Sequence, residues 1–176
     1  MGLDARAVGE RLQARFGNDI VAVEADAADP WAEVAPRALA DVCRFLRNDP
    51  EMRFDMLHCI TAVDYLWTDP KKSPEYPPHV EVFYHMSSMT HRHRFVVKAT
   101  LPRWKDDVPG ELPELPSVGS IWNTAQWHEC EVFDLSGVRF TGHPDLRRIL
   151  CPEDWEGHPL RRDYVMPQEY HGLRGR

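Results

Sequence analysis

The chain has 176 residues, of which 43% are hydrophobic and 28% charged, and its formal net charge is -7. This length and balance fit one globular domain with a core of its own. The acidic balance argues against nucleic-acid binding and against anionic membrane surfaces, because both need a basic face. No stretch reaches the roughly 20 apolar residues of a membrane-spanning helix. We therefore expect membrane contact only through partner subunits.

The N-terminal residues do not resemble a targeting segment, because Asp4 and Glu10 interrupt the basic residues and no hydrophobic core follows. None of the four cysteines has the C-x-x-C spacing of a metal or redox motif. They are Cys43, Cys59, Cys130 and Cys151. This pattern favours reduced thiols, a cytoplasmic compartment and no iron–sulfur cluster in this chain.

The first fifty residues predict two helices. Val8, Leu12 and Phe16 recur at helical spacing, which predicts a helix over residues 3–16 that ends at Gly17. A short β-branched strand is expected at 20–23. The Asp29-Pro30-Trp31 step should interrupt regular structure before a second amphipathic helix near 36–47.

Three strand-like runs follow, at residues 54–66, 80–87 and 94–101. The second alternates Val80, Val82, Tyr84 and Met86 with more polar neighbours, as a half-buried strand does. The proline-rich residues 68–79 predict a surface loop between two of these strands. This order predicts an α+β fold, with helices packed on a small mixed, mostly antiparallel sheet.

Residues 102–116 are expected to form a second proline-rich linker. Ser117 is a good N-cap for a helix that carries Val118, Ile121, Trp122 and Ala125 at helical spacing. This helix is expected to continue to residue 135 and to stop at 136–137. Beyond residue 140 few periodic runs remain. We therefore expect a globular domain at 1–140 and an extended C-terminal segment at 141–176 that docks on a partner subunit.

The C-terminal third contains a short internal echo. The run GHPDLRR at residues 142–148 is followed fifteen residues later by GHPLRRD at 157–163. Each copy has a glycine, a histidine held extended by the next proline, a leucine and an arginine pair. Paired arginines suit carboxylates, either within the chain or across an interface. Solvated surface ion pairs are the simpler alternative.

Three carboxylates lie upstream on the expected helix, so we treat them and the echo together as candidate partner-interface residues. The candidates are Glu129, Glu131, Asp134, His143, Pro144, Asp145, Arg147, Arg148, His158, Pro159, Arg161, Arg162 and Asp163. The last residues, 164–176, have no apolar period. Because they cannot recover the entropy of ordering alone, they are either disordered or laid along another protein.

Two other kinds of chemistry stay open. His128, His143 and His158 could bind zinc, which needs three or four converging ligands. A histidine next to Cys130 or Cys151 could activate the thiol, but no third orienting group can be chosen from the sequence. His-Pro turns explain the histidines structurally without either chemistry.

The run ECEVFDLSGV at residues 129–138, followed by Phe140 and HPDLRRIL at 143–150, resembles the 30 kDa subunit family of respiratory NADH:quinone oxidoreductase (complex I). EGHPLRRDY at 156–164, YHMSSMTH at 84–91 and PSV at 116–118 are similar too. The resemblance covers residues 54–165. Cys130 stands where the family usually has arginine, and Ser136 where it has an aromatic residue.

The resemblance implies a non-catalytic scaffold in the peripheral arm of a proton-translocating oxidoreductase that passes electrons from NADH to quinone. The chain would pack on the quinone-site subunit, which is related to hydrogenase large subunits, and near iron–sulfur subunits, on the cytoplasmic side of the inner membrane. It would hold no cofactor, since FMN and iron–sulfur clusters belong to partner subunits. An equivalent subunit of a membrane-bound energy-converting hydrogenase or of a ferredoxin-dependent photosynthetic complex is the nearest alternative. A small His- or Cys-dependent hydrolase or metalloprotein is the second.

Overall fold

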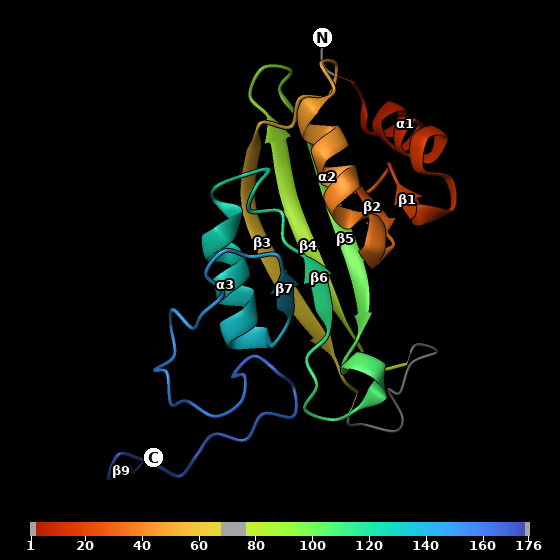
Figure 1. Ribbon diagram of the computed structural model, residues 1–176. Helices are drawn as coiled ribbons and strands as arrows, with labels where there is room; N and C mark the ends of the chain where they lie inside the picture. The colour runs from red at the N-terminus through yellow and green to blue at the C-terminus, as the bar shows by residue number, and fades with distance from the viewer. Residues whose placement is uncertain (1–2, 68–76, 175–176) are drawn as a thin grey trace.

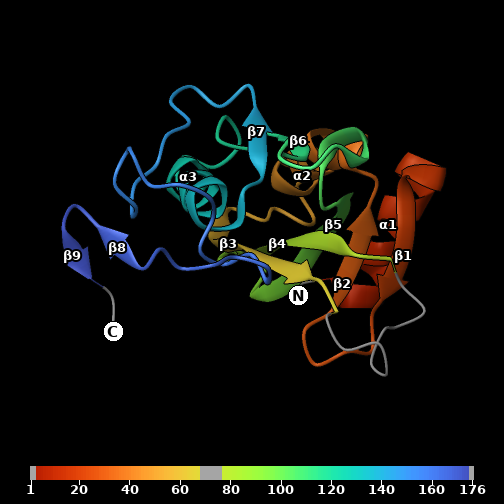
Figure 2. The ribbon, with the colours of Figure 1, turned by 90° about the horizontal axis from the view of Figure 1, so that it is seen from below.

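A computed structural model describes residues 3–67 and 77–174. It has an α+β architecture in which a five-stranded sheet carries helices on one side (Figures 1 and 2). The strand order is β1-β2-β5-β4-β3, and β2 with β5 is the one parallel pair of this sheet among the described residues. The predicted fold class is confirmed.

The N-terminal half supplies one edge of this sheet. Helix α1 (Ala5–Phe16) begins at Asp4, whose side chain accepts a hydrogen bond from the Ala7 N–H, and is followed by a 3-10 turn (Gly17–Asp19). Strands β1 (Ile20–Glu24) and β2 (Trp31–Val34) come next. A second 3-10 turn (Pro36–Ala38) leads into α2 (Leu39–Asn48). Both helices and the first strand match the predictions.

The three long strands are β3 (Met56–Tyr65), β4 (His79–Ser88) and β5 (His93–Pro102). Burial alternates along the whole of β4, as its sequence predicts: Val80, Val82, Tyr84 and Met86 are buried, while the residues between them are half-buried. Most of the predicted loop at 68–79 lies outside the described residues. The buried face packs under α2 and α3, and the other face of the sheet is open (Figure 2).

The second half of the chain completes the helical layer. It contains a 3-10 turn (Lys105–Asp107), β6 (Glu114–Pro116), α3 (Ala125–Ser136) and β7 (Arg139–Thr141), and β6 pairs with β7 in parallel. A hairpin of β8 (Glu169–Tyr170) and β9 (Leu173–Arg174) closes the chain. Between 142 and 168 the backbone has only turns and bends.

The predicted start of the third helix is wrong. Residues 118–124 form turns, and α3 begins at Ala125. Ser117 does not cap a helix, because its hydroxyl donates to the buried carboxylate of Glu129 at 2.6 Å. The apolar spacing that suggested a helix still buries Val118 and Trp122, and the indole N–H of Trp122 donates to the Phe54 carbonyl at 2.9 Å.

Candidate functional site

Arg161, from the second copy of the echo, closes the C-terminal end of α3. The last carbonyls of a helix have no partner within the helix, and they prefer a cation. The guanidinium of Arg161 donates to the Ser136 carbonyl at 2.6 Å and to the Gly137 carbonyl at 2.9 Å. It also donates to the Arg103 carbonyl at 3.0 Å and lies 4.7 Å from the centre of the Trp104 ring. Arg161 is therefore a buried part of this chain's own fold.

Asp134 holds the first copy of the echo to the same helix. One carboxylate oxygen accepts the backbone N–H groups of Ile149, Leu150 and Cys151 at 3.0, 2.7 and 2.9 Å. The other accepts the Arg148 guanidinium at 2.7 Å. Burial alone would raise the pKa of Asp134, but these four donors outweigh it and lower the pKa to about 2. The carboxylate thus fixes the chain where it turns away from α3.

The two histidines of the echo do the same thing at two places on α3. His143 Nε2 donates to the Gln126 carbonyl at 3.0 Å, and His158 Nδ1 donates to the Asp134 carbonyl at 2.9 Å. The other nitrogen of His143 accepts the Asp145 N–H at 3.0 Å. Burial lowers the pKa of His158, and Arg148 adds to the effect. The repeated Gly-His-Pro unit is therefore a repeated anchor on one helix.

Glu129 is fully buried near the start of α3. Its carboxylate accepts the Ser117 hydroxyl at 2.6 Å and the Val118 N–H at 2.7 Å, and it lies 3.8 Å from His143 Nε2. Burial raises the pKa of Glu129, although both hydrogen bonds oppose the shift. This carboxylate joins the 117–118 turn to α3.

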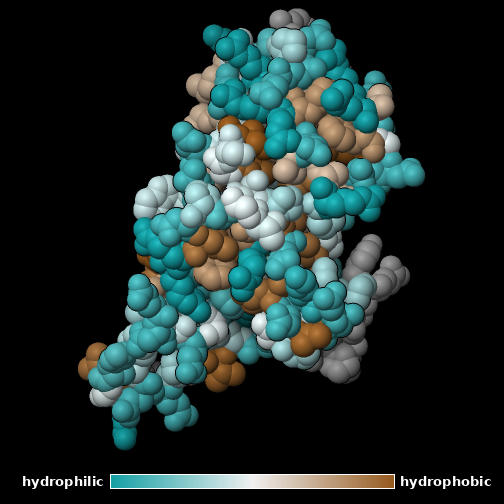
Figure 3. Space-filling view, viewed as in Figure 1, coloured by the Kyte–Doolittle hydropathy of each residue, from teal (hydrophilic) through white to brown (hydrophobic). Residues whose placement is uncertain are grey.

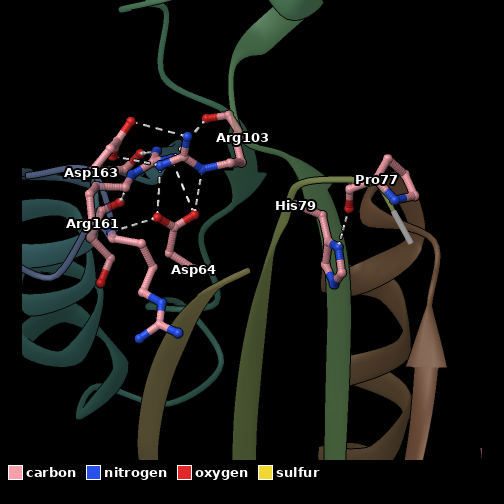
Figure 4. Close-up of polar contacts among 9 residues, drawn as sticks. Asp64, Pro77, His79, Arg103, Arg161 and Asp163 are labelled. Atoms are coloured by element: carbon pink, nitrogen blue, oxygen red, sulfur yellow. Dashed lines mark hydrogen bonds and ion pairs between the residues drawn. The ribbon is translucent and has the colours of Figure 1, made fainter. Parts of the chain in front are cut away.

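A network of four charged side chains, here called the clamp, fixes the C-terminal segment to the sheet (Figure 4). Its members are Asp64, Arg103, Arg161 and Asp163. Arg103 follows β5 and donates to both oxygens of Asp64 on β3, at 2.6 and 2.8 Å. It also donates to Asp163 at 2.7 Å, and the Arg162 N–H donates to Asp64 at 2.8 Å. The hydrogen bond to Arg103 lowers the pKa of Asp163.

The remaining sequence-predicted residues lie nearer the surface. Arg147 pairs only with neighbouring Asp145, at 2.9 Å, and both side chains are exposed. Glu131, Pro144 and the side chain of Arg162 are exposed, and Pro159 is half-buried. Of the thirteen candidates, the structure gives intrachain partners to the buried ones and leaves these on the outside. The role of all thirteen at an interface stays a prediction.

The sequence reasoning missed Asp64 and Arg103. The signal for Asp64 was visible, because a carboxylate inside an apolar strand needs a buried partner. The partner could not be chosen from the sequence, since Arg103 lies 39 residues away and Asp163 a further 60 residues from Arg103.

The alternative chemistries have specific positions in the structure. Cys130 Sγ lies 3.8 Å from His143 Nε2, but Cys130 is 5% exposed and both imidazole nitrogens already bond to backbone groups. Within residues 3–67 and 77–174, no group of three His, Cys, Asp or Glu side chains is suited to hold a metal ion. These contacts make His143 an anchor of the fold rather than a base.

Beyond the clamp the chain carries apolar side chains into solvent. Val165 is 84% exposed and Met166 63% exposed. The hairpin β8–β9 then packs back on the preceding turn, where Asp154 accepts the Tyr170 hydroxyl and His171 Nε2, each at 2.6 Å. Figure 3 shows this segment at lower left as mainly hydrophilic, with single apolar residues on it. These side chains face no core of this chain.

In the part of the chain that the structure describes, no helix is both long and apolar enough to span a membrane. The protein family described as "Respiratory-chain NADH dehydrogenase, 30 Kd subunit" matches residues 32–170. A subunit of NADH-quinone oxidoreductase from Roseiflexus sp. (strain RS-1) is 42% identical over 169 residues, covering 96% of this chain and 88% of the relative. The subunit of the same name from Chlorobium phaeobacteroides (strain DSM 266 / SMG 266 / 2430) is 36% identical over 172 residues, covering 97% and 94%.

A chain in the solved structure of the membrane-bound sulfane sulfur reductase, an archaeal respiratory membrane complex, has the same fold. The TM-score is 0.69, the sequence identity is 22%, and the match covers 93% of this chain and 87% of that one. This likeness concerns the fold alone.

Proposed function

Because the chain belongs to the family of the 30 Kd subunit of respiratory-chain NADH dehydrogenase, we propose that it is a non-catalytic scaffold in the peripheral arm of a proton-translocating NADH:quinone oxidoreductase. In this role it packs on the quinone-site subunit and so supports electron transfer from NADH to quinone. The matched relatives are named as subunits of that oxidoreductase.

One observation carries the docking part of this proposal. The C-terminal segment is fixed by α3 and the clamp, and it then leaves the body with Leu160, Val165, Met166 and Leu173 at 59 to 84% exposure. Ordering a backbone costs about 1–2 kcal/mol per residue, and exposed apolar side chains recover none of it in water. A partner surface that buries these side chains would recover it.

The candidate residues divide between two tasks in this proposal. The buried ones, Glu129, Asp134, His143, Arg148, His158 and Arg161, hold the segment in one register on its own domain. The exposed ones, Glu131, Pro144, Asp145, Arg147 and Arg162, are available to a partner. A firm anchor lowers the entropy lost on binding, so both groups serve the same interface.

The proposal also places the chain peripherally, on the cytoplasmic side of the inner membrane, with membrane contact only through partner subunits. FMN and the iron–sulfur clusters then belong to neighbouring subunits. An equivalent subunit of an energy-converting hydrogenase or a ferredoxin-dependent complex is the alternative. The 36–42% identity to NADH-quinone oxidoreductase subunits favours the first candidate over it.

Two matched substitutions test the docking. Met166→Asp places a charge on the segment, and Met89→Asp places one on the β4–β5 turn at nearly the same exposure, 67% against 63%. Each variant replaces the native chain in cells that lack it, and the complex is purified from membranes in mild detergent. We expect Met166→Asp to reduce recovery of the quinone-site subunit and NADH:quinone activity, and Met89→Asp to leave both unchanged.

Equal recovery with the two variants would contradict docking through the segment. Recovery of the native chain with a nickel hydrogenase pair would move the proposal to the sister complex. Recovery of the native chain as a free soluble protein would contradict the scaffold role altogether.

A further inference from the structure

An aromatic hollow lies on the open face of the sheet, away from the helices and from the segment described above. Its volume is about 490 Å³. Trp31 of β2, Tyr65 of β3 and Trp67 form its aromatic walls, and Glu33, Glu81 and Lys98 form its floor. Trp67 is 41% exposed. The hollow therefore combines wide aromatic surfaces with charged groups at its base.

The wall next to β4 is built firmly. The Tyr65 and His79 rings stack with their centres 4.6 Å apart and their planes 17° apart. His79 Nδ1 donates to the Pro77 carbonyl at 2.8 Å, as Figure 4 shows. These contacts hold the wall in one arrangement, so a ligand would find it largely formed.

The floor carries more negative than positive charge. Lys98 Nζ lies 2.8 Å from Glu81, 3.3 Å from Glu33 and 4.3 Å from the centre of the Trp31 ring. Burial opposes the charge of Lys98, yet the two carboxylates outweigh it and raise its pKa. Two carboxylates therefore face one ammonium, which leaves one formal negative charge among these three groups. Their side chains are only 12 to 20% exposed, so water screens this charge poorly.

Trp31 already shows what the hollow recognises, because its ring holds the Lys98 ammonium. Aromatic faces attract cations, and arginine more often than lysine. A guanidinium is planar, stacks on tryptophan and pairs with a carboxylate at the same time. A neutral apolar side chain would leave the extra carboxylate charge without a partner. The walls and the floor thus fit one ligand, a guanidinium.

We propose that this hollow binds an arginine side chain of a neighbouring subunit. The open sheet face then forms a second interface, separate from the C-terminal segment. This inference rests on the proposed function in one respect: the chain must be part of a complex.

A photo-cross-linking amino acid at position 67 tests it in the assembled complex, purified from membranes. The same amino acid at position 127 is the matched control, because Trp127 is also an exposed tryptophan but lies on α3, at 63% exposure. We expect position 67 to form an adduct with a segment of another subunit that carries an arginine, and position 127 to form no adduct with that segment. Changing that arginine to glutamate should abolish the adduct.

Removing the wall is the second test. Loss of a cation–π contact of about 0.5–2 kcal/mol corresponds to roughly 2- to 30-fold weaker binding. Trp67→Ala should therefore release the chain from the complex at lower salt than the native chain does, whereas Trp127→Ala should not. The thermal unfolding of both isolated variants shows whether either change disturbs the fold.

Adducts confined to this chain, or to a segment without arginine, would overturn the inference while leaving the proposed function intact. The same holds if the complex contains the chain and position 67 gives no adduct at all. Absence of the native chain from the complex would instead overturn the proposed function, and the inference with it.

Discussion

His158 packs directly against the backbone of Gly137. A side-chain carbon built on Gly137 would lie 2.5 Å from Cδ2 of the His158 ring. Gly137 also has a φ of 68° and a ψ of 50°, the left-handed conformation that glycine adopts most readily. One glycine therefore both ends α3 and makes room for the imidazole that bonds to the Asp134 carbonyl.

Gly137→Ala should destabilise the chain by about 2–4 kcal/mol, because left-handed backbone strain and the displaced imidazole act together. Gly142→Ala is the control, since Gly142 has a φ of 79° but no atom within 4 Å of the added carbon. It should show only the backbone part, about 1 kcal/mol. Urea unfolding of the two purified variants measures the difference, and equal losses would mean that the His158 contact contributes nothing.

Asp134→Asn should destabilise the chain by about 2 kcal/mol at neutral pH, because the pKa falls from 3.8 to about 2 on folding. A carboxyl group whose folded pKa is lowered stabilises the fold above its unfolded pKa. The contribution is therefore complete above pH 4 and disappears between about pH 4 and 2. Unfolding free energies of the native chain and the variant at pH 6, 3.5 and 2.5 check this. A difference that does not change with pH would contradict it.

Glu129→Gln should be much milder, although both carboxylates are fully buried on the same helix. Burial raises the pKa of Glu129, so ionisation opposes folding and its penalty grows as pH rises above the ordinary value. The amide removes that penalty and can still accept from the Val118 N–H. We expect a loss under about 1 kcal/mol at pH 7. A loss as large as that of Asp134→Asn, in the same urea experiment, would refute the assigned direction.

Arg103→Met should cost about 3–5 kcal/mol, because it leaves the Asp64 carboxylate buried without its two-point partner. Adding Asp64→Asn should restore part of the loss, since the uncompensated charge is then gone. Differential scanning calorimetry of the single and double variants measures both effects. A double variant less stable than Arg103→Met alone would show that Asp64 acts mainly through other contacts.

Arg147→Ala and Arg161→Ala separate the interface from the anchor. Arg147 makes an exposed pair with Asp145, so its loss should change stability by less than about 1 kcal/mol while reducing assembly with the quinone-site subunit. Arg161 leaves three carbonyls without donors, so its loss should lower stability by at least about 3 kcal/mol. Melting temperatures together with the amount of chain in the purified complex distinguish the two. If neither variant changes assembly, the role of the arginine pairs at an interface is refuted.

The local patterns predicted much of the fold. Spacing of Val8, Leu12 and Phe16 gave α1, and alternation along residues 80–87 gave β4. Strand β2 was missed because it is four residues long, follows a proline and pairs with β5 more than sixty residues away. The start of α3 was misplaced because Ser117 bonds to Glu129 instead of to a helix N-terminus. In each case a distant contact outweighed a local preference.

The sequence alone determined the α+β class, the echo of two Gly-His-Pro units and the family likeness, because spacing and residue type act within a few positions of the chain. Only the tertiary structure decided what the charged residues do. It placed Arg161 and Asp134 inside the chain's own fold, left Arg147 outside, and joined Asp64 to Arg103. The reason is physical: a buried charge requires a partner, and the packing of distant segments determines which partner lies within hydrogen-bonding distance.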